Sequence, residues 1–179
     1  MTSIVDSRNA VLLGRLEDIF ISLGYEGTQF VPQSKTLPFP TLLLPLAADA
    51  HDRPRFMTLM IYPAVEFEDT ILLQYYTDLP FVVPAEHLQA VTAFLPLLNH
   101  KAVVGYFGLT GGGEKPYYRY VQALRAAEPV SPAHVADVAT LVTATPDIFQ
   151  AILEAVATGR TTPVQARAQV DALYARFQQ

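Results

Sequence analysis

The chain has 179 residues, of which 51% are hydrophobic and 16% charged, so it suits one folded domain and is too apolar to be disordered over most of its length. Its net charge is −5 and it has no cluster of lysine and arginine, which disfavours binding to nucleic acid or to a membrane surface. It contains no cysteine, which excludes disulfides, thiolate zinc sites and a catalytic thiol.

A first helix is expected between about residues 6 and 23, where apolar residues recur at three- and four-residue spacing. Gly24 follows this stretch and suits the left-handed position that ends many helices. Residues 25–40 are rich in glycine and proline, and we interpret them as an irregular connection.

Three strands are expected next, because short apolar runs rich in β-branched and aromatic residues alternate with turn signals. Pro45 favours an edge position for the first strand, since proline cannot donate a hydrogen bond to a neighbouring strand. Glu66, Glu68 and Asp69 indicate a solvated loop, which is a simpler interpretation than a pair of catalytic acids. The three expected strands are residues 41–46, 56–62 and 71–77.

A second helix is expected after Pro84, because proline is tolerated in the first turn of a helix. Pro96 is expected to kink the last turn of this helix or to start a separate one. Two more strands are expected over residues 102–109 and 117–124, joined by a glycine-rich hairpin that begins at Thr110.

Ser131 and the proline after it predict the start of a third helix that runs toward Val156, with Pro146 as a candidate break. Thr162 begins a capping-box pattern and predicts a last helix over residues 162–178.

These elements predict one α+β domain over residues 1–179, in the order α-β-β-β-α-β-β-α, with residues 162–178 as an appended C-terminal helix. Short turns between successive strands imply a mostly antiparallel, five-stranded sheet with helices packed on one face. The first residues lack a signal-peptide pattern and no apolar run approaches 18 residues, so we expect a cytoplasmic protein without a membrane span.

Candidate chemistry is weak in this sequence. Gly108 and Gly113 have the spacing of a phosphate-binding loop, but Glu114 takes the place of the lysine and a strand is expected next. The histidines are scattered, and His134 with Asp137 supplies too few ligands for zinc. There is no nucleophile-elbow pattern. We therefore expect a hairpin at the glycines, no enzymatic activity, and no cofactor or metal.

Aromatic residues crowd the expected strands, and tyrosine is enriched at protein interfaces, although ordinary sheet packing explains them equally well. The apolar stripe of the last helix is a candidate dimer contact, or it closes the core. The candidate partner-contact residues are Tyr106, Tyr118, Tyr120, Val170, Leu173, Tyr174 and Phe177.

Between Tyr76 and Leu124 the sequence shows a helix start, a helix end, a glycine within a strand and an aromatic strand after a hairpin. These are Val83-Pro84, Leu98-Asn99-His100, Val104-Gly105-Tyr106-Phe107 and Tyr118-Arg119-Tyr120. In this order they resemble the YbjN-like family, which is similar in fold to type III secretion chaperones. The resemblance implies a homodimeric, cofactor-free domain, in a fold whose members are described as chaperones or regulators. Asn99 is expected to close its helix, and Gly105 to allow close backbone approach or a bulge.

Two functional hypotheses follow. The first is a non-enzymatic protein-interaction domain, chaperone-like or regulatory, that acts as a homodimer and presents a sheet edge or helical face to an unidentified protein. The alternative is a small-molecule-binding sensory domain with a pocket between sheet and helices, which requires convergent polar groups around a cavity. A third class, an enzyme, requires perturbed ionisable groups gathered in one cleft.

Overall fold

A computed structural model describes residues 4–35, 37–62 and 69–177 of the chain. These residues belong to two compact units, each assembled from two separate stretches of sequence. Unit 1 comprises Met1–Thr77 and Tyr120–Thr140, and unit 2 comprises Asp78–Arg119 and Leu141–Gln179. Strand β6 (Pro116–Arg125) and helix α3 (Pro132–Ala157) therefore contribute residues to both units.

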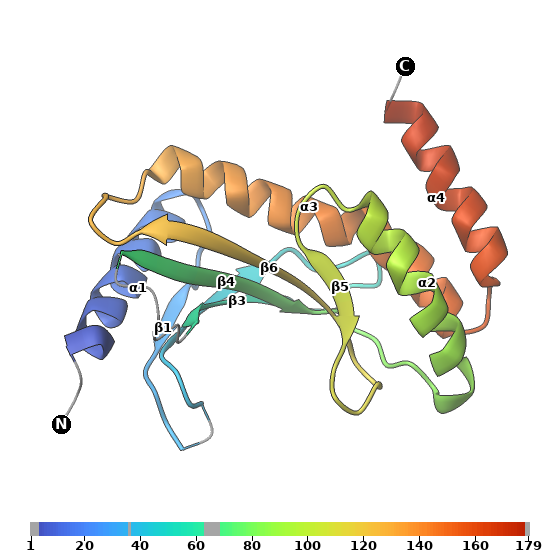
Figure 1. Ribbon diagram of the computed structural model, residues 1–179, viewed down its shortest axis with the longest axis horizontal. Coiled ribbons are helices and arrows are strands. Elements are labelled where there is room, and N and C mark those ends of the chain that lie inside the picture. The colour runs from blue at the N-terminus through green and yellow to red at the C-terminus, as the bar shows by residue number, and fades with distance from the viewer. Residues whose placement is uncertain (1–3, 36, 63–68, 178–179) are drawn as a thin grey trace. The chain divides into compact units, whose positions relative to one another are not determined.

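The elements follow one another largely as expected (Figure 1). Besides β6 and α3 they are α1 (Ile4–Ser22), β1 (Gln29–Val31), β2 (Thr41–Leu46), β3 (Arg55–Tyr62), β4 (Thr70–Asp78), the 3-10 turn η1 (Ala85–His87), α2 (Leu88–Lys101), β5 (Tyr106–Leu109) and α4 (Pro163–Phe177). The strands form a six-stranded sheet in the order β1-β2-β3-β4-β6-β5. None of the helices in the described ranges combines the length and the apolar composition needed to cross a bilayer.

The expected count of five strands is wrong because β1 lies inside the stretch interpreted as an irregular connection. Its three residues are too few to show an alternating pattern between the surrounding glycines and prolines. β1 pairs with Thr41–Leu43, so β2 is an inner strand rather than the expected edge. The pairing stops before Pro45, which explains how an inner strand tolerates a residue without an N–H group.

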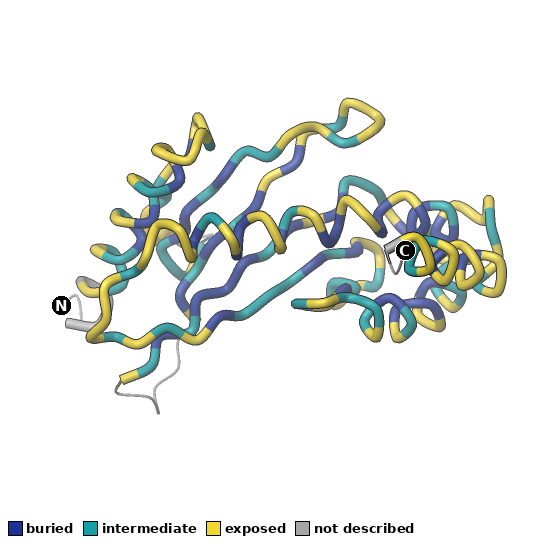
Figure 2. Tube along the Cα trace, turned by 90° about the horizontal axis from the view of Figure 1, so that it is seen from above, coloured by how far each residue is buried: buried dark blue, intermediate teal, exposed yellow. Residues whose placement is uncertain are grey.

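In unit 1, burial alternates along the strands, and Figure 2 shows buried and less buried positions following one another. In Figure 1, α1 and residues 132–140 of α3 lie over one face of the unit 1 strands, and we assign the buried positions to this face. This covered face includes Leu42, Leu44, Met57, Leu59, Ile61, Ile71, Leu73 and Tyr75. The opposite face has no described helix over it in unit 1, and we call it the open face.

In unit 2, α2 packs on β5 and on α4, and the second half of α3 completes the core. Phe107 meets Phe149 edge to face, with ring centroids 5.9 Å apart. Pro96 and Pro146 both lie inside helices that continue past them, so neither divides its helix. Buried Val142 and Phe149 on either side of Pro146 hold that helix against the core in spite of its missing hydrogen bond.

The turn between β2 and β3 is held by the carboxylate of Asp49. It accepts hydrogen bonds from the N–H groups of His51 (2.9 Å) and Arg53 (3.0 Å) and from Nε of Arg53 (2.8 Å). The Asp49 side chain is 4% exposed and also forms an ion pair with Arg53 at 2.6 Å. Desolvation raises the pKa of Asp49, but these hydrogen bonds and the Arg53 charge outweigh it and place the pKa below its ordinary value.

Replacing Asp49 with asparagine is expected to destabilise the protein by about 1 kcal/mol at pH 7, because the ion pair and the charge-assisted bonds are lost. The pKa is lowered by folding, so this stabilisation is present above the unfolded pKa of about 3.9 and disappears as the pH falls below it. Urea unfolding at pH 7 and pH 3 measures both effects. Asp52→Asn, in the same turn and exposed, is the control and is expected to change stability little at either pH.

Candidate interaction surfaces

The open face of unit 1 is mainly apolar. Strand alternation and the pairing register place on it Thr41, Leu43, Pro45, Phe56, Thr58, Met60, Tyr62, Thr70, Leu72, Gln74, Tyr76, Val121, Ala123 and Arg125. Among these described residues Arg125, at the end of β6, carries the one charge, and it is exposed. Phe56 and Tyr62, at the two ends of β3, remain 46% and 44% exposed. This face is therefore the strongest candidate surface in unit 1.

In unit 2 the exposed surface of the sheet carries a cluster formed by Tyr106, Tyr117 and Arg119. The two tyrosine rings meet edge to face at 6.2 Å, and Arg119 donates to the Tyr106 hydroxyl at 3.0 Å. Burial, together with the charge and the hydrogen bond of Tyr106, raises the pKa of Tyr117 in spite of the opposing charge of Arg119. Tyr106 is 37% exposed and remains a contact candidate.

Tyr118 is fully buried, so it is removed from the set of partner-contact candidates. Its hydroxyl donates to the carbonyl of Val104, and its ring packs against Phe107 with centroids 5.1 Å apart. Gly105 lies between Val104 and Phe107 in the sequence. Its φ is +68°, in the left-handed region that glycine allows. The expectation of close backbone approach at Gly105 is confirmed, since a Cβ there would lie 2.7 Å from the carbonyl oxygen of Arg119.

Asn99 takes part in the same arrangement. The expectation that it closes α2 is wrong, because the helix continues to Lys101. Its side-chain amide donates to the carbonyl of Phe107 (3.0 Å) and accepts from the N–H of Phe107 (2.6 Å). β5 lies at the edge of the sheet, so this amide satisfies edge groups as a neighbouring strand would. The motif residues between 98 and 119 therefore hold α2, β5 and β6 together within unit 2.

Replacing Asn99 with alanine is expected to destabilise the protein by about 2 kcal/mol, because two partly buried backbone groups of Phe107 lose their partners. Thermal or urea unfolding measures the change. His100→Ala is the matched control on the same helix, since His100 is exposed, and it is expected to stay within about 0.5 kcal/mol of the parent. Equal stability of the two variants would contradict the role given to the amide.

Tyr120 lies on the covered side of unit 1. Its ring packs on Tyr75 at 5.9 Å, and Tyr75 donates to Gln122 at 3.1 Å. Gln122 in turn contacts the imidazole of His134 at 2.7 Å. Burial, and to a lesser degree Tyr120, raises the pKa of Tyr75. Tyr120 is half-buried in this network and stays a weaker contact candidate than Tyr106.

The stripe on α4 packs within unit 2. Val170 is fully buried, so it is also removed from the contact candidates, and Leu173 is half-buried. The ring of Tyr174 stacks on Phe149 at 6.4 Å, and its hydroxyl donates to the carbonyl of Lys101. The side chain of Phe177 lies outside what the structure describes. The stripe therefore contributes to the core of unit 2, which was the second of the two expectations for it.

The residues singled out in the sequence as candidates for phosphate binding, acid catalysis or metal binding lie apart. Gly108 and Gly113 belong to the β5–β6 hairpin, as expected, where Thr110 donates its N–H to the carbonyl of Lys115 at 2.9 Å. Glu66 and Glu68 lie outside the described residues. Over the ranges that are described, no three His, Asp or Glu side chains gather where a metal ion would bind. The histidines occupy separate places, at residues 51, 87, 100 and 134.

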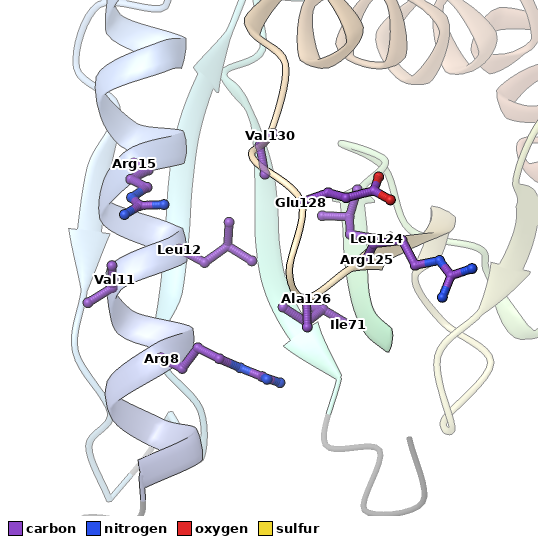
Figure 3. A pocket seen from close by; sticks show the side chains of 10 residues that line it. All are labelled: Arg8, Val11, Leu12, Arg15, Ile71, Leu124, Arg125, Ala126, Glu128 and Val130. Carbon is purple, nitrogen blue, oxygen red and sulfur yellow. The ribbon is translucent and has the colours of Figure 1, made fainter. Parts of the chain in front are cut away.

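A groove that sequence reasoning missed lies in unit 1, between α1 and the segment that joins β6 to α3 (Figure 3). Its volume is about 520 Å³. Arg8, Val11, Leu12 and Arg15 line one side, spaced at three and four residues along α1, so they share one helix face. Ile71, Leu124 and Val130 are among the residues that line the rest of it. The spacing along α1 was visible in the sequence, but its distant partners were not.

Proteins similar to this chain are found among solved structures. No family model matches the chain, and no curated protein matches it by sequence. Among solved structures, "Crystal structure of YbjN, a putative transcription regulator from E. coli" matches at 17% identity and a TM-score of 0.45, over 82% of this chain and 93% of that one.

Proposed function

We propose that the protein is a non-enzymatic interaction domain that acts as a homodimer, in which two copies meet through the open face of unit 1. The observation that carries the proposal is this mainly apolar face, with Phe56 and Tyr62 exposed on it and Arg125 as its one charged side chain among the described strand positions. Apolar surface of this kind gains free energy when it is covered, at roughly 25 cal/mol per Å². A chaperone-like or regulatory role toward a further protein partner belongs to the same proposal.

The distribution of charge favours the open face as the place where two copies meet. The chain carries a net charge of −5, so two copies repel one another through most of their surfaces. The described strand positions of the open face carry no acidic side chain, so that repulsion is smaller there, and in a two-fold dimer the same face is presented by both copies.

The sheet edges are less suited to pairing than this face. The edge strands are short: β1 has three residues and β5 has four. In β5 the backbone N–H of Phe107 already donates a hydrogen bond to the side chain of Asn99. Short and covered edges disfavour pairing with another strand. The proposal therefore places the contact on the face and no longer on the edge considered first.

Light scattering coupled to size exclusion tests the proposal. The protein is expected to elute with twice the mass of one chain at micromolar concentration. A strict monomer at high concentration would overturn it.

The alternative function, a small-molecule-binding domain, is favoured by one specific observation. The groove beside α1 lies between sheet and helix, and its volume of about 520 Å³ is within the range of ligand pockets. A thermal-shift screen separates the two functions, because a ligand that binds the native state raises the melting temperature.

A further inference from the structure

The groove beside α1 has an apolar lining. Leu12 and Ile71 lie in it from helix and sheet, and Val11 at its side is 56% exposed. Figure 3 shows Leu12 reaching from α1 toward Ala126 and Ile71. An apolar lining of this size leaves surface that the chain itself does not cover, and an apolar ligand would remove it from water.

Two arginines flank Leu12 on α1. Arg8 extends across the groove in Figure 3, whereas Arg15, one turn beyond Leu12, keeps its guanidinium beside the helix. Both are exposed, and neither forms an ion pair or side-chain hydrogen bond with the residues that the structure describes. An unpaired guanidinium beside a low-dielectric surface offers planar donors that match a carboxylate.

No described acidic side chain within the groove forms an ion pair with these arginines. Glu128 lines it, but Figure 3 shows its carboxylate turned away from α1, together with the guanidinium of Arg125. The groove is therefore locally cationic in a protein whose net charge is −5. Complementarity calls for a ligand that is apolar along its body and negative at one end.

We propose that this groove binds a small amphipathic anion, with its apolar body along Leu12 and Ile71 and its acidic headgroup held by Arg8, while Arg15 adds positive charge two turns further along α1. The inference names the ligand class for the alternative function and does not depend on the homodimer. It makes the cationic end of the groove the part that selects the ligand.

Calorimetric titration with decanoate, and with decyltrimethylammonium as a cation of equal chain length, tests the proposal. Decanoate is expected to bind at least about tenfold more tightly, which is the order of one charge-assisted hydrogen bond. Its affinity is expected to fall with added salt, since both arginines are exposed. Equal binding of the two probes, or binding of neither, would overturn the proposal.

Variants locate the site. Arg8→Gln is expected to weaken decanoate binding by about fivefold to tenfold and Arg15→Gln by less, whereas Arg176→Gln, at an exposed arginine of α4 in unit 2, is expected to leave it unchanged. If decanoate bound all three variants with the affinity of the parent, the groove would not be its site. Light scattering on the same samples keeps the two proposals separate, because loss of decanoate binding is expected without any change in the dimer.

Discussion

Replacing Gly105 with alanine is expected to destabilise the protein by about 3–5 kcal/mol, the largest loss of any single methyl addition considered for this chain. Gly105 has φ +68°, and an alanine in that region costs about 1–2 kcal/mol. The added Cβ would also press on the hydroxyl of Tyr118 and on the carbonyl of Arg119, which belongs to the backbone of β6 and cannot turn aside. Urea unfolding of parent and variant measures the difference.

Gly14→Ala is the matched control for this substitution. Gly14 lies inside α1 with nothing within 4 Å of the position of an added Cβ. Alanine there is expected to stabilise the helix by about 0.5–1 kcal/mol. The same chemical change should therefore have opposite signs at the two glycines. If Gly105→Ala retained the stability of the parent, the packing assigned to β5 would be wrong.

Replacing Phe56 with lysine is expected to weaken the proposed homodimer by about 100-fold or more, equivalent to about 3 kcal/mol at a well-packed aromatic contact. Phe56 is 46% exposed in one chain, so the fold is expected to tolerate a long polar side chain there. In a two-fold dimer each substitution adds a positive charge to both copies of the same face, which already carries Arg125. Sedimentation equilibrium over a range of concentrations measures the dissociation constant.

Val164→Lys is the control for the dimer experiment. Val164 lies on α4 in unit 2 and is 80% exposed, so it receives the same charge at a site outside the open face. The control is expected to dimerise as the parent does. A dimer that survives Phe56→Lys but dissociates with Val164→Lys would move the interface from the open face to α4.

Local signals in the sequence predicted most of the elements because they act through near neighbours. Ser131 begins α3 as expected, since its hydroxyl accepts from the N–H of His134 at 3.4 Å. Thr162 and Gln165 form the expected capping box, with bonds of 3.0 and 3.3 Å. The short apolar run at β2, with turn signals on both sides, predicted both of its bounds, Thr41 and Leu46. These signals need no knowledge of the distant chain.

The features that were missed or misjudged depend on residues far apart in sequence. Alternation showed that Tyr118 lies on one face of its strand, but not that this face is buried and that its hydroxyl bonds to Val104. The helical spacing of Arg8 and Arg15 likewise does not reveal that residues 124–130 lie opposite them. The candidate surfaces are therefore identified from the burial of residues in the structure, which distinguishes the two faces of the sheet.

The division of each unit into two stretches of sequence has a consequence for how the protein is made on the ribosome. Residues 1–77 emerge early, but unit 1 also needs residues 120–140, which supply the end of β6 and the start of α3. Until those residues leave the exit tunnel, Leu59, Leu73 and Tyr75 lack part of the cover that buries them in the finished fold. Nascent chains with fewer than about 140 residues outside the tunnel should accordingly expose apolar surface. A cellular holdase would bind to this surface.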